Sequence, residues 1–492
     1  MSADRSTLQR FVQTDWLYSS AIVALVLLTY APVLWGNYAF LDDYVFLRAA
    51  QQGSWSGFVP VLGAGRPVAA VLLSWGFSVG ASIDHLWILR AFTIGGLGLA
   101  AVCTFRAFCL AGHPQFLSAA IGTTMFLLPS FQVYASWAQY FVTGPTICLA
   151  YLAFSCAFKT RSVFIIRDKF LRTAAAILLL GISAAIYQPL AMCYWLYLAI
   201  ALTGPGIDQR ALKQKLPFLA SVGAAGAASG YLIFRACQMF YPSTNARFSL
   251  TTQFQAKLSW FFSEALRRVA GLNLLNSGGA VSLLLGATVV IGVWFYCQNV
   301  LKAGRQTLLF LGCCVLLASA PNLLTGENWA SSRSLGGLTM IWTLFGFLAV
   351  CGFTHLRPAD ARPLAAGIMS FWLLTSAVLA SRNTTELFVL PQERELSFIK
   401  AGLAAPEFTP GKRLVFVGGH WSILASPLVL YDEFGLASTA VSYTLRPMLE
   451  LLLPKVRPDI STAAIRIVDF GAAINAAPDE YVLDMKGLQA LK

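Results

Sequence analysis

The chain has 492 residues, of which 57% are hydrophobic and only 12% are charged. A soluble protein usually carries about 25% charged residues, so this composition excludes an ordinary soluble domain and predicts a polytopic membrane protein. The net charge of +13 does not indicate a nucleic-acid partner. The basic residues lie mostly in short loops between apolar segments, where they orient membrane helices, and no basic stripe with interleaved aromatic residues occurs outside those segments.

Apolar segments of roughly 20 residues, the length that a helix needs to cross a bilayer, recur along the chain. The first, at 17–36, is too long for the apolar part of a signal peptide and lacks a small-residue cleavage site, so we expect a retained membrane helix. Ten further spans are expected at about 86–110, 116–131, 139–158, 173–187, 189–203, 217–240, 280–300, 306–324, 334–354 and 363–381.

Basic residues predict how these spans are oriented. Arg5 and Arg10 precede the first span, so we expect a cytoplasmic N-terminus and an outer first loop at 37–85. The apolar segment 67–83 is short for a span, and if it crossed the membrane every later basic loop would lie outside. We therefore expect an interfacial helix there. With eleven spans in all, the C-terminus is expected on the outer face.

The last part of the chain differs in composition from the rest. Residues 382–492 contain 11 Lys+Arg and 12 Asp+Glu, against 24 and 10 in residues 1–381. Apolar runs bounded by Gly, Pro or charge predict strands at 413–417, 464–470 and 481–485, and helices are expected at 393–402 and 442–453. The sequence therefore predicts two domains, a transmembrane domain of residues 1–381 and a small extracytoplasmic α/β domain of residues 382–492.

Charged residues of the outer loops are the candidates for chemistry. None of the expected spans contains Asp or Glu, which argues against a proton-driven transporter, because such proteins usually need an intramembrane acid. Two adjacent carboxylates follow the first span, and a carboxylate can accept a proton from an attacking hydroxyl. Arginines can hold a phosphate leaving group through paired, charged hydrogen bonds. Asp84 and Glu264 are also acids of the outer loops. The residues singled out as candidates are the acids Asp42, Asp43 and Glu327 and the phosphate contacts Arg66, Arg235 and Arg333.

Each candidate also has a structural interpretation. The acid pair at 42–43 could cap and charge the first turn of a short helix. The Gly-Arg-Pro sequence at 65–67 could be only a turn, and the Tyr-Gln-Pro sequence at 187–189 only a break in a helix. Glu327 and Arg333 could form a loop ion pair of little energetic value. The sequence leaves these alternatives open.

Three motifs together resemble a known family. The sequences Leu41-Asp42-Asp43-Tyr44, Gly65-Arg66-Pro67 and Tyr187-Gln188-Pro189 resemble those of polytopic glycosyltransferases of the GT-C superfamily, and most those of the serotype-converting O-antigen glucosyltransferases of bacteria and their phages. The resemblance covers the membrane part of the chain, but its motifs comprise only these short stretches. The C-terminal region carries no motif of the family.

The resemblance implies an enzyme of the bacterial inner membrane with its active site on the periplasmic face. Such an enzyme moves a hexose, here expected to be glucose, from a polyprenyl-phosphate donor to a hydroxyl of a periplasmic glycan such as O-antigen or another lipid-linked polysaccharide. It also implies that an acid of the first outer loop is the catalytic base, and we expect Asp43 in this role with Asp42 supporting it. Tyr187 and Gln188 are expected at the substrate.

A metal ion and two other functions stay open. Some relatives bind a divalent cation at the first-loop acid and others do not; Asp42 and Asp43 are oxygen ligands of the kind that Mg²⁺ or Mn²⁺ accepts. A flippase or transporter of a lipid-linked or anionic substrate would use the outer arginines as a binding vestibule, although the absence of acids from the expected spans weighs against it. A structural membrane component whose C-terminal region binds a partner is a third interpretation.

Overall fold

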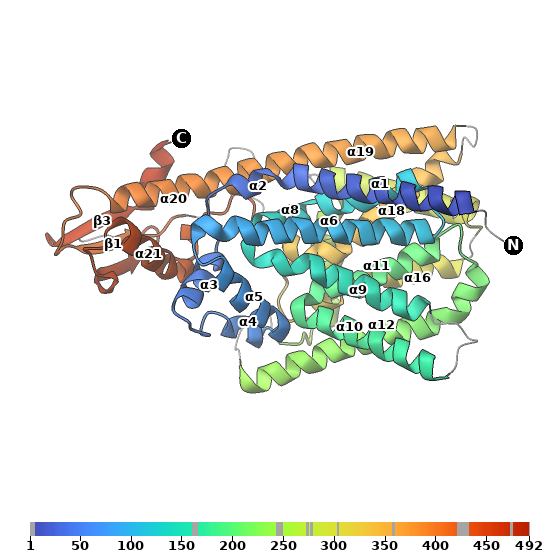
Figure 1. The fold of residues 1–492 in the computed structure, drawn as a ribbon, viewed down its shortest axis with the longest axis horizontal. Helices are drawn as coiled ribbons and strands as arrows, with labels where there is room; N and C mark the ends of the chain where they lie inside the picture. Colours follow the sequence, from blue (N-terminus) through green and yellow to red (C-terminus); the bar gives the residue numbers. More distant parts are fainter. Residues whose placement is uncertain are drawn as a thin grey trace.

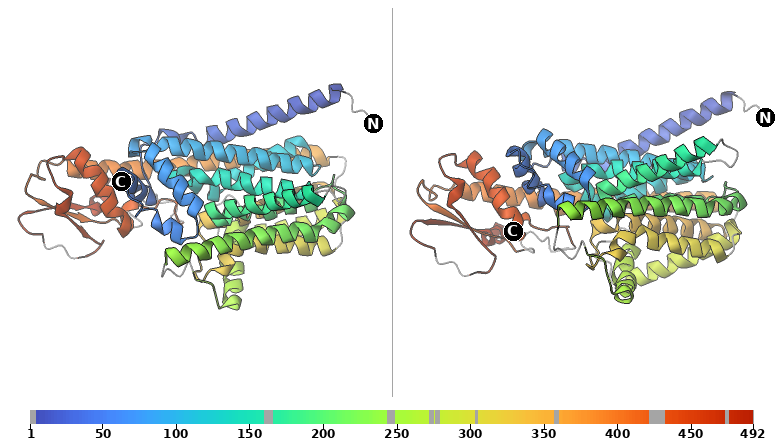
Figure 2. Two further views of the ribbon diagram at one scale, coloured as in Figure 1. Left: turned by 60° about the horizontal axis from the view of Figure 1, so that its bottom comes forward. Right: turned by 90° about the horizontal axis from the view of Figure 1, so that it is seen from below.

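A computed structural model describes residues 5–159, 166–242, 249–271, 275, 279–302, 305–356, 360–420, 432–472 and 476–491. The helices form an elongated bundle with a small sheet at one end (Figures 1 and 2). In chain order the helices are α1 (Arg5–Tyr30), α2 (Pro32–Trp35), α3 (Asp42–Gln51), α4 (Val59–Gly63), α5 (Pro67–Val79), α6 (Leu86–Leu110), α7 (Gln115–Thr124), α8 (Pro129–Ser136), α9 (Thr143–Phe158), α10 (Ile166–Ala191), α11 (Cys193–Thr203), α12 (Gln209–Phe240), α13 (Phe254–Trp260), α14 (Leu266–Ala270), α15 (Gly279–Phe295), α16 (Arg305–Ala318), α17 (Ala320–Leu324), α18 (Gly336–Thr354), α19 (Ala361–Thr384), α20 (Leu390–Leu403) and α21 (Ser442–Val456).

Each of the eleven expected spans has a counterpart among these helices. Within the described residues, seven helices are long and apolar enough to cross a membrane, and one bent pair makes an eighth. The bent pair breaks where Leu128 adopts an extended conformation before Pro129, because the proline ring disfavours a helical conformation for the preceding residue. Three expected spans correspond to shorter apolar helices, at Asp15–Tyr30, Cys193–Thr203 and Arg305–Ala318. The chain is a multi-pass membrane protein.

The first loop folds into three short helices, α3, α4 and α5. The last of these, Pro67–Val79, is an apolar helix of 13 residues, too short to cross a bilayer by itself. It begins with proline at its first position, where the missing N–H has no helical partner to lose. These helices lie at the end of the bundle that carries the sheet, and the N-terminus lies at the opposite end (Figure 1). This is the relative placement that the charge pattern predicts.

The C-terminal region contains the three strands and two helices that the sequence predicts. All three strands are parallel, with β1 (Arg413–Val417) between β2 (Ile465–Val468) and β3 (Glu480–Asp484). Four consecutive residues of β1 are buried, as is typical of a central parallel strand. A continuous helical segment, Ala361–Leu403, passes from the bundle into this region, so the two expected domains share a helix.

A glycine pair allows α6 and α9 to cross closely. A Cβ atom on Gly144 would lie 2.3 Å from the backbone carbonyl carbon of Gly96, and small residues of this kind let helix backbones approach in membrane bundles. Gly95 faces open space. We therefore expect Gly144→Ala to destabilise the protein by about 1–3 kcal/mol and Gly95→Ala to leave stability unchanged, measured as unfolding of the purified protein in detergent. Equal unfolding temperatures for the two variants would contradict this crossing.

Candidate active site

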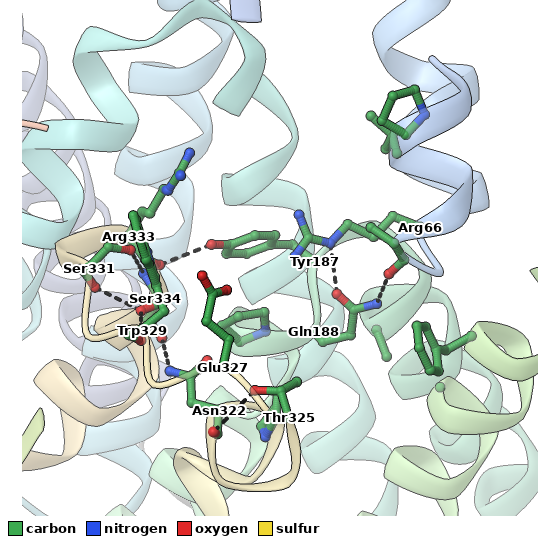
Figure 3. Close-up of a pocket in the computed structure, with 18 of the residues that line it drawn as sticks. Arg66, Tyr187, Gln188, Asn322, Thr325, Glu327, Trp329, Ser331, Arg333 and Ser334 are labelled. Atoms are coloured by element: carbon green, nitrogen blue, oxygen red, sulfur yellow. Dashed lines mark hydrogen bonds between the residues drawn. The ribbon is translucent and has the colours of Figure 1, made fainter. Parts of the chain in front are cut away.

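A cavity of about 590 Å³ lies where the first loop, the bundle and the C-terminal region meet. Small and apolar residues of α10 and α12 form part of its wall, and charged and aromatic side chains form the rest. Six of the eight residues that the sequence singled out line it; Figure 3 shows five of them with their neighbours. The six are Asp42, Arg66, Tyr187, Gln188, Glu327 and Arg333, whereas Asp43 and Arg235 are not among the lining residues.

Asp42 begins α3 and faces the cavity. Its position in the first helical turn is one that favours an acidic side chain, because the helix dipole is positive there. One carboxylate oxygen accepts a hydrogen bond of 3.1 Å from Nε2 of Gln139, and the other accepts one of 2.6 Å from the hydroxyl of Tyr443. Both oxygens are therefore oriented, while the carboxylate still borders the cavity.

Asp43 is fully buried behind Asp42. Its two oxygens accept hydrogen bonds from the backbone amides of Phe40 and Gln139, each 3.1 Å long. Burial raises the pKa of Asp43 from 3.8 to about 7, and the positive charge of Arg90 opposes this shift. The bond to the Phe40 amide, just before the helix, resembles the capping role that the sequence left as the structural alternative.

The backbone before the acid pair is strained. Leu41 has a positive φ of 47°, which a leucine rarely adopts. Its buried amide donates a hydrogen bond of 3.1 Å to the hydroxyl oxygen of Ser438 in the C-terminal region. Strained residues persist where the surroundings determine them, and they are frequent at functional sites. Here the strained residue directly precedes α3, the helix that begins with Asp42.

The Gly-Arg-Pro and Tyr-Gln-Pro motifs form one structural unit. Nε of Arg66 donates a hydrogen bond of 2.8 Å to Oε1 of Gln188, and Nε2 of Gln188 donates to the carbonyl oxygens of Ala64 and Gly65 at 3.1 and 3.2 Å. The guanidinium carbon of Arg66 lies 4.6 Å from the ring centre of Tyr187, close enough for a cation–π interaction. Figure 3 shows Arg66 and Gln188 together on one side, with the ring of Tyr187 reaching from them to the Arg333 segment, where its hydroxyl donates to the Arg333 carbonyl oxygen over 3.1 Å.

A break in α10 makes this unit possible. Tyr187 is non-helical within α10, with φ −155° and ψ 101°. Pro189, two residues later, has no N–H to donate and its ring clashes with the carbonyl group four residues before it. The resulting break turns the side chains of Tyr187 and Gln188 toward the cavity. None of the ion pairs among the described residues involves Arg66, so its charge is held in place without a carboxylate partner.

Arg333 occupies the other side of the cavity and has an acid partner. Its Nε lies 2.8 Å from Oε1 of Glu433, and this carboxylate is almost completely buried, with 4% of its side chain exposed. Nη1 of Arg333 donates a hydrogen bond of 3.3 Å to the hydroxyl of Tyr140. The sequence left open an ion pair between Arg333 and Glu327. In the structure, Arg333 instead pairs with Glu433 of the C-terminal region.

Glu327 and Arg235 have different surroundings. Glu327 lines the cavity, and its side chain points toward Tyr187 (Figure 3). Its carbonyl oxygen accepts a hydrogen bond of 2.5 Å from Nζ of Lys257, which also donates to Oδ1 of Asn328 at 2.9 Å; the lysine thereby holds this loop. Arg235 is exposed on α12 and lies outside the cavity lining.

The acidic groups do not fit a resident divalent cation. Among the described residues, no group of three or more His, Cys, Asp and Glu side chains is placed to hold a metal ion. Of the two carboxylates that the sequence offered as ligands, Asp43 is buried with both oxygens bonded to backbone amides, so Asp42 alone of the pair faces the cavity.

Several residues of the site could not be found by sequence reasoning. Gln139 donates from its amide to Asp43 and from its side chain to Asp42, and the only sequence signal is a lone polar residue near the start of an expected span. Tyr443 and Glu433 come from the C-terminal region, where no motif marks them. Arg90 is fully buried in α6 and donates to the carbonyl oxygens of Gly36 and Tyr38.

The fold and the cavity define a multi-pass membrane protein whose helical bundle carries a cavity at one end. The cavity is lined by an acid and by an arginine that has no carboxylate partner among the described residues. No protein-family model and no curated protein matches the sequence. In fold, the chain is similar to ArnT from Cupriavidus metallidurans in the apo state, with a TM-score of 0.42, 10% identity and coverage of 87% of this chain and 85% of that one. It is also similar to ArnT from Cupriavidus metallidurans bound to undecaprenyl phosphate, with a TM-score of 0.45, 11% identity and coverage of 93% and 90%. Both likenesses concern the fold alone.

Proposed function

We propose that the protein is a glycosyltransferase of the bacterial inner membrane. It moves a hexose, with glucose as the expected sugar, from a polyprenyl-phosphate carrier to a hydroxyl group of a periplasmic glycan. The observation that carries the proposal is that Asp42 and Arg66 line one cavity at the end of an apolar bundle. A base and a phosphate-binding cation are the two groups that this reaction requires of the protein.

Asp42 is the proposed general base. The acceptor hydroxyl transfers its proton to the Asp42 carboxylate while its oxygen forms a bond to the anomeric carbon of the donor sugar. The bond between that carbon and the phosphate oxygen breaks, and the lipid phosphate leaves with the electron pair as a stable anion. The sequence favoured Asp43 as the base, but the geometry favours Asp42. Asp43 is buried, and both of its oxygens accept backbone hydrogen bonds.

Arg66 is the proposed phosphate contact. A guanidinium group binds phosphate through paired hydrogen bonds and keeps its charge at all physiological pH values. Gln188 and Tyr187 hold Arg66 in one orientation, which reduces the entropy lost when the donor binds. Arg333 is less suited, because Glu433 already balances its charge.

The polyprenyl chain requires an apolar path beside the phosphate. Ala184 of α10 and Ala227 and Gly230 of α12 line the same cavity. Gly230 packs closely against Ala184, so the two helices approach each other and present a continuous apolar wall to the cavity. We assign this wall to the first isoprene units of the donor. The sugar would then lie between Arg66 and Asp42.

The proposal is tested with the two arginines that the structure separates. Radiolabelled glucosyl polyprenyl phosphate is supplied to the purified protein in lipid nanodiscs, with lipopolysaccharide as acceptor. Loss of a charged hydrogen bond is worth roughly 1.5–3 kcal/mol, so we expect Arg66→Gln to raise the KM for the donor by about ten- to hundredfold. Arg235→Gln removes an exposed arginine outside the cavity and is expected to leave KM unchanged.

Two results would contradict the proposal. Equal KM values for Arg66→Gln and the parent protein would remove Arg66 from the donor site. Movement of the labelled lipid across the membrane of a proteoliposome, without transfer of the sugar to any acceptor, would instead support the flippase alternative.

A further inference from the structure

The Asp42 carboxylate is oriented in part by the C-terminal region. The hydroxyl of Tyr443, at the start of α21, donates to one oxygen over 2.6 Å, and Gln139 donates to the other over 3.1 Å. Two donors on different oxygens fix the rotation of the carboxylate about its own axis. An ionised carboxylate has about four lone-pair directions, so two are left to accept a proton from the cavity.

The packing of α21 against α3 places this hydroxyl. Tyr443 contacts Asp42 at the start of both helices, and six to seven residues further along, Glu450 of α21 forms an ion pair with Arg48 of α3. The two contacts follow in the same order along both helices, so the helices pack in parallel with a defined register. The hydrogen bond from Leu41 to Ser438 joins the same two segments just before the helices begin.

The Tyr443 side chain lies at the edge of the cavity, with its hydroxyl bonded to Asp42. The side chain lines the cavity and is 54% exposed, so it contributes little to a packed core. A tyrosine that served only packing would bury its ring. Its bond to Asp42 is instead a short hydrogen bond to an ionised group, a strong kind that orients both partners.

We infer that Tyr443 is a positioning residue for the catalytic base, and that the C-terminal region thereby completes the active site. This inference rests on the proposed function, because it assigns to Asp42 the role of base. Tyr443 does not itself exchange a proton with the substrate. It keeps the free lone pairs of Asp42 directed at the acceptor hydroxyl, and without it the carboxylate can rotate away.

The test compares two Tyr→Phe variants of the full chain. Tyr443→Phe removes the hydroxyl beside Asp42. Tyr481→Phe removes a hydroxyl that donates over 2.8 Å to the carbonyl oxygen of Gly402, in the same region but away from the cavity lining. Since a misplaced catalytic group slows a reaction steeply, we expect Tyr443→Phe to lower kcat by roughly ten- to hundredfold with an unchanged KM for the donor. Tyr481→Phe is expected to keep the parent kcat.

The pH dependence of kcat separates positioning from a merely structural role. A carboxylate that loses a donated hydrogen bond is protonated more easily, so the acidic limb of the profile is expected to move to higher pH in Tyr443→Phe only. If Tyr443→Phe keeps the kcat and pH profile of the parent while Asp42→Asn is inactive, this inference is overturned and the proposed function stands. A lower unfolding temperature with an unshifted profile would also overturn it. Full activity of Asp42→Asn would overturn both.

Discussion

Asp42→Asn is expected to slow sugar transfer by about 10²–10⁴-fold, the usual contribution of a general base, without unfolding the protein. The asparagine side chain has the same shape and can still accept the hydrogen bond from Tyr443 or Gln139, but it cannot take a proton from the acceptor hydroxyl. The measurement is the initial rate of transfer from radiolabelled glucosyl polyprenyl phosphate, at equal amounts of purified protein with equal unfolding temperatures.

Asp43→Asn is the matched control for this variant. Its amide group can offer only one acceptor oxygen to the two backbone N–H groups that Asp43 now satisfies, so we expect a loss of stability of about 1–3 kcal/mol.

The raised pKa of Asp43, about 7, means that the folded protein holds the proton of this carboxyl group more tightly than the unfolded chain does. Its contribution to stability is therefore full below about pH 4 and falls as the pH rises through 7. Asp43→Asn should flatten that dependence. Inactivity of Asp43→Asn with full activity of Asp42→Asn would restore the assignment that the sequence favoured.

The part of the site that the sequence predicts is the part encoded by neighbouring residues. The two acids after the first span and the two proline-terminated motifs are local, and each marks a helix boundary that sequence rules recognise. Which of two adjacent acids faces the cavity is not local. Successive residues of a helix point about 100° apart, and the rotation of α3 is set by Gln139 and by α21, both distant in the chain.

The same reasoning explains why the sequence misplaced Arg235 and did not indicate the partner of Arg333. Arg235 lies in an apolar segment and therefore drew attention, but the residues of α12 that line the cavity are Ala227, Gly230, Tyr231 and Phe234. The sequence identifies the helix and not the face that it turns inward. The partner of Arg333 is 100 residues away in a region without motifs, so nothing near it indicates that its charge is balanced. Long-range polar pairs of this kind require the packed structure.

Glu433→Gln is expected to destabilise the protein by about 3 kcal/mol, near the lower end of the range for breaking a buried ion pair. The substitution leaves the guanidinium of Arg333, only 19% exposed, without its counter-charge in a poorly solvated site. Glu386→Gln is the control, because its partner Arg382 and Glu386 itself are 54% and 44% exposed and such pairs are worth at most about 1 kcal/mol. Both are measured by unfolding in detergent.

The double variant Arg333→Met with Glu433→Gln separates the ion pair from the packing around it. If an unpaired buried charge causes the loss, removing both charges should recover most of the stability of the single variant. If Glu433→Gln and Glu386→Gln have the same small effect, Glu433 does not secure the C-terminal region to the segment that precedes α18. Because that region also carries the Tyr443 contact with Asp42, loosening it at Glu433 should lower kcat as well as stability. Loss of stability with an unchanged kcat would mean that α21 stays docked on α3 through Arg48 and Glu450 alone.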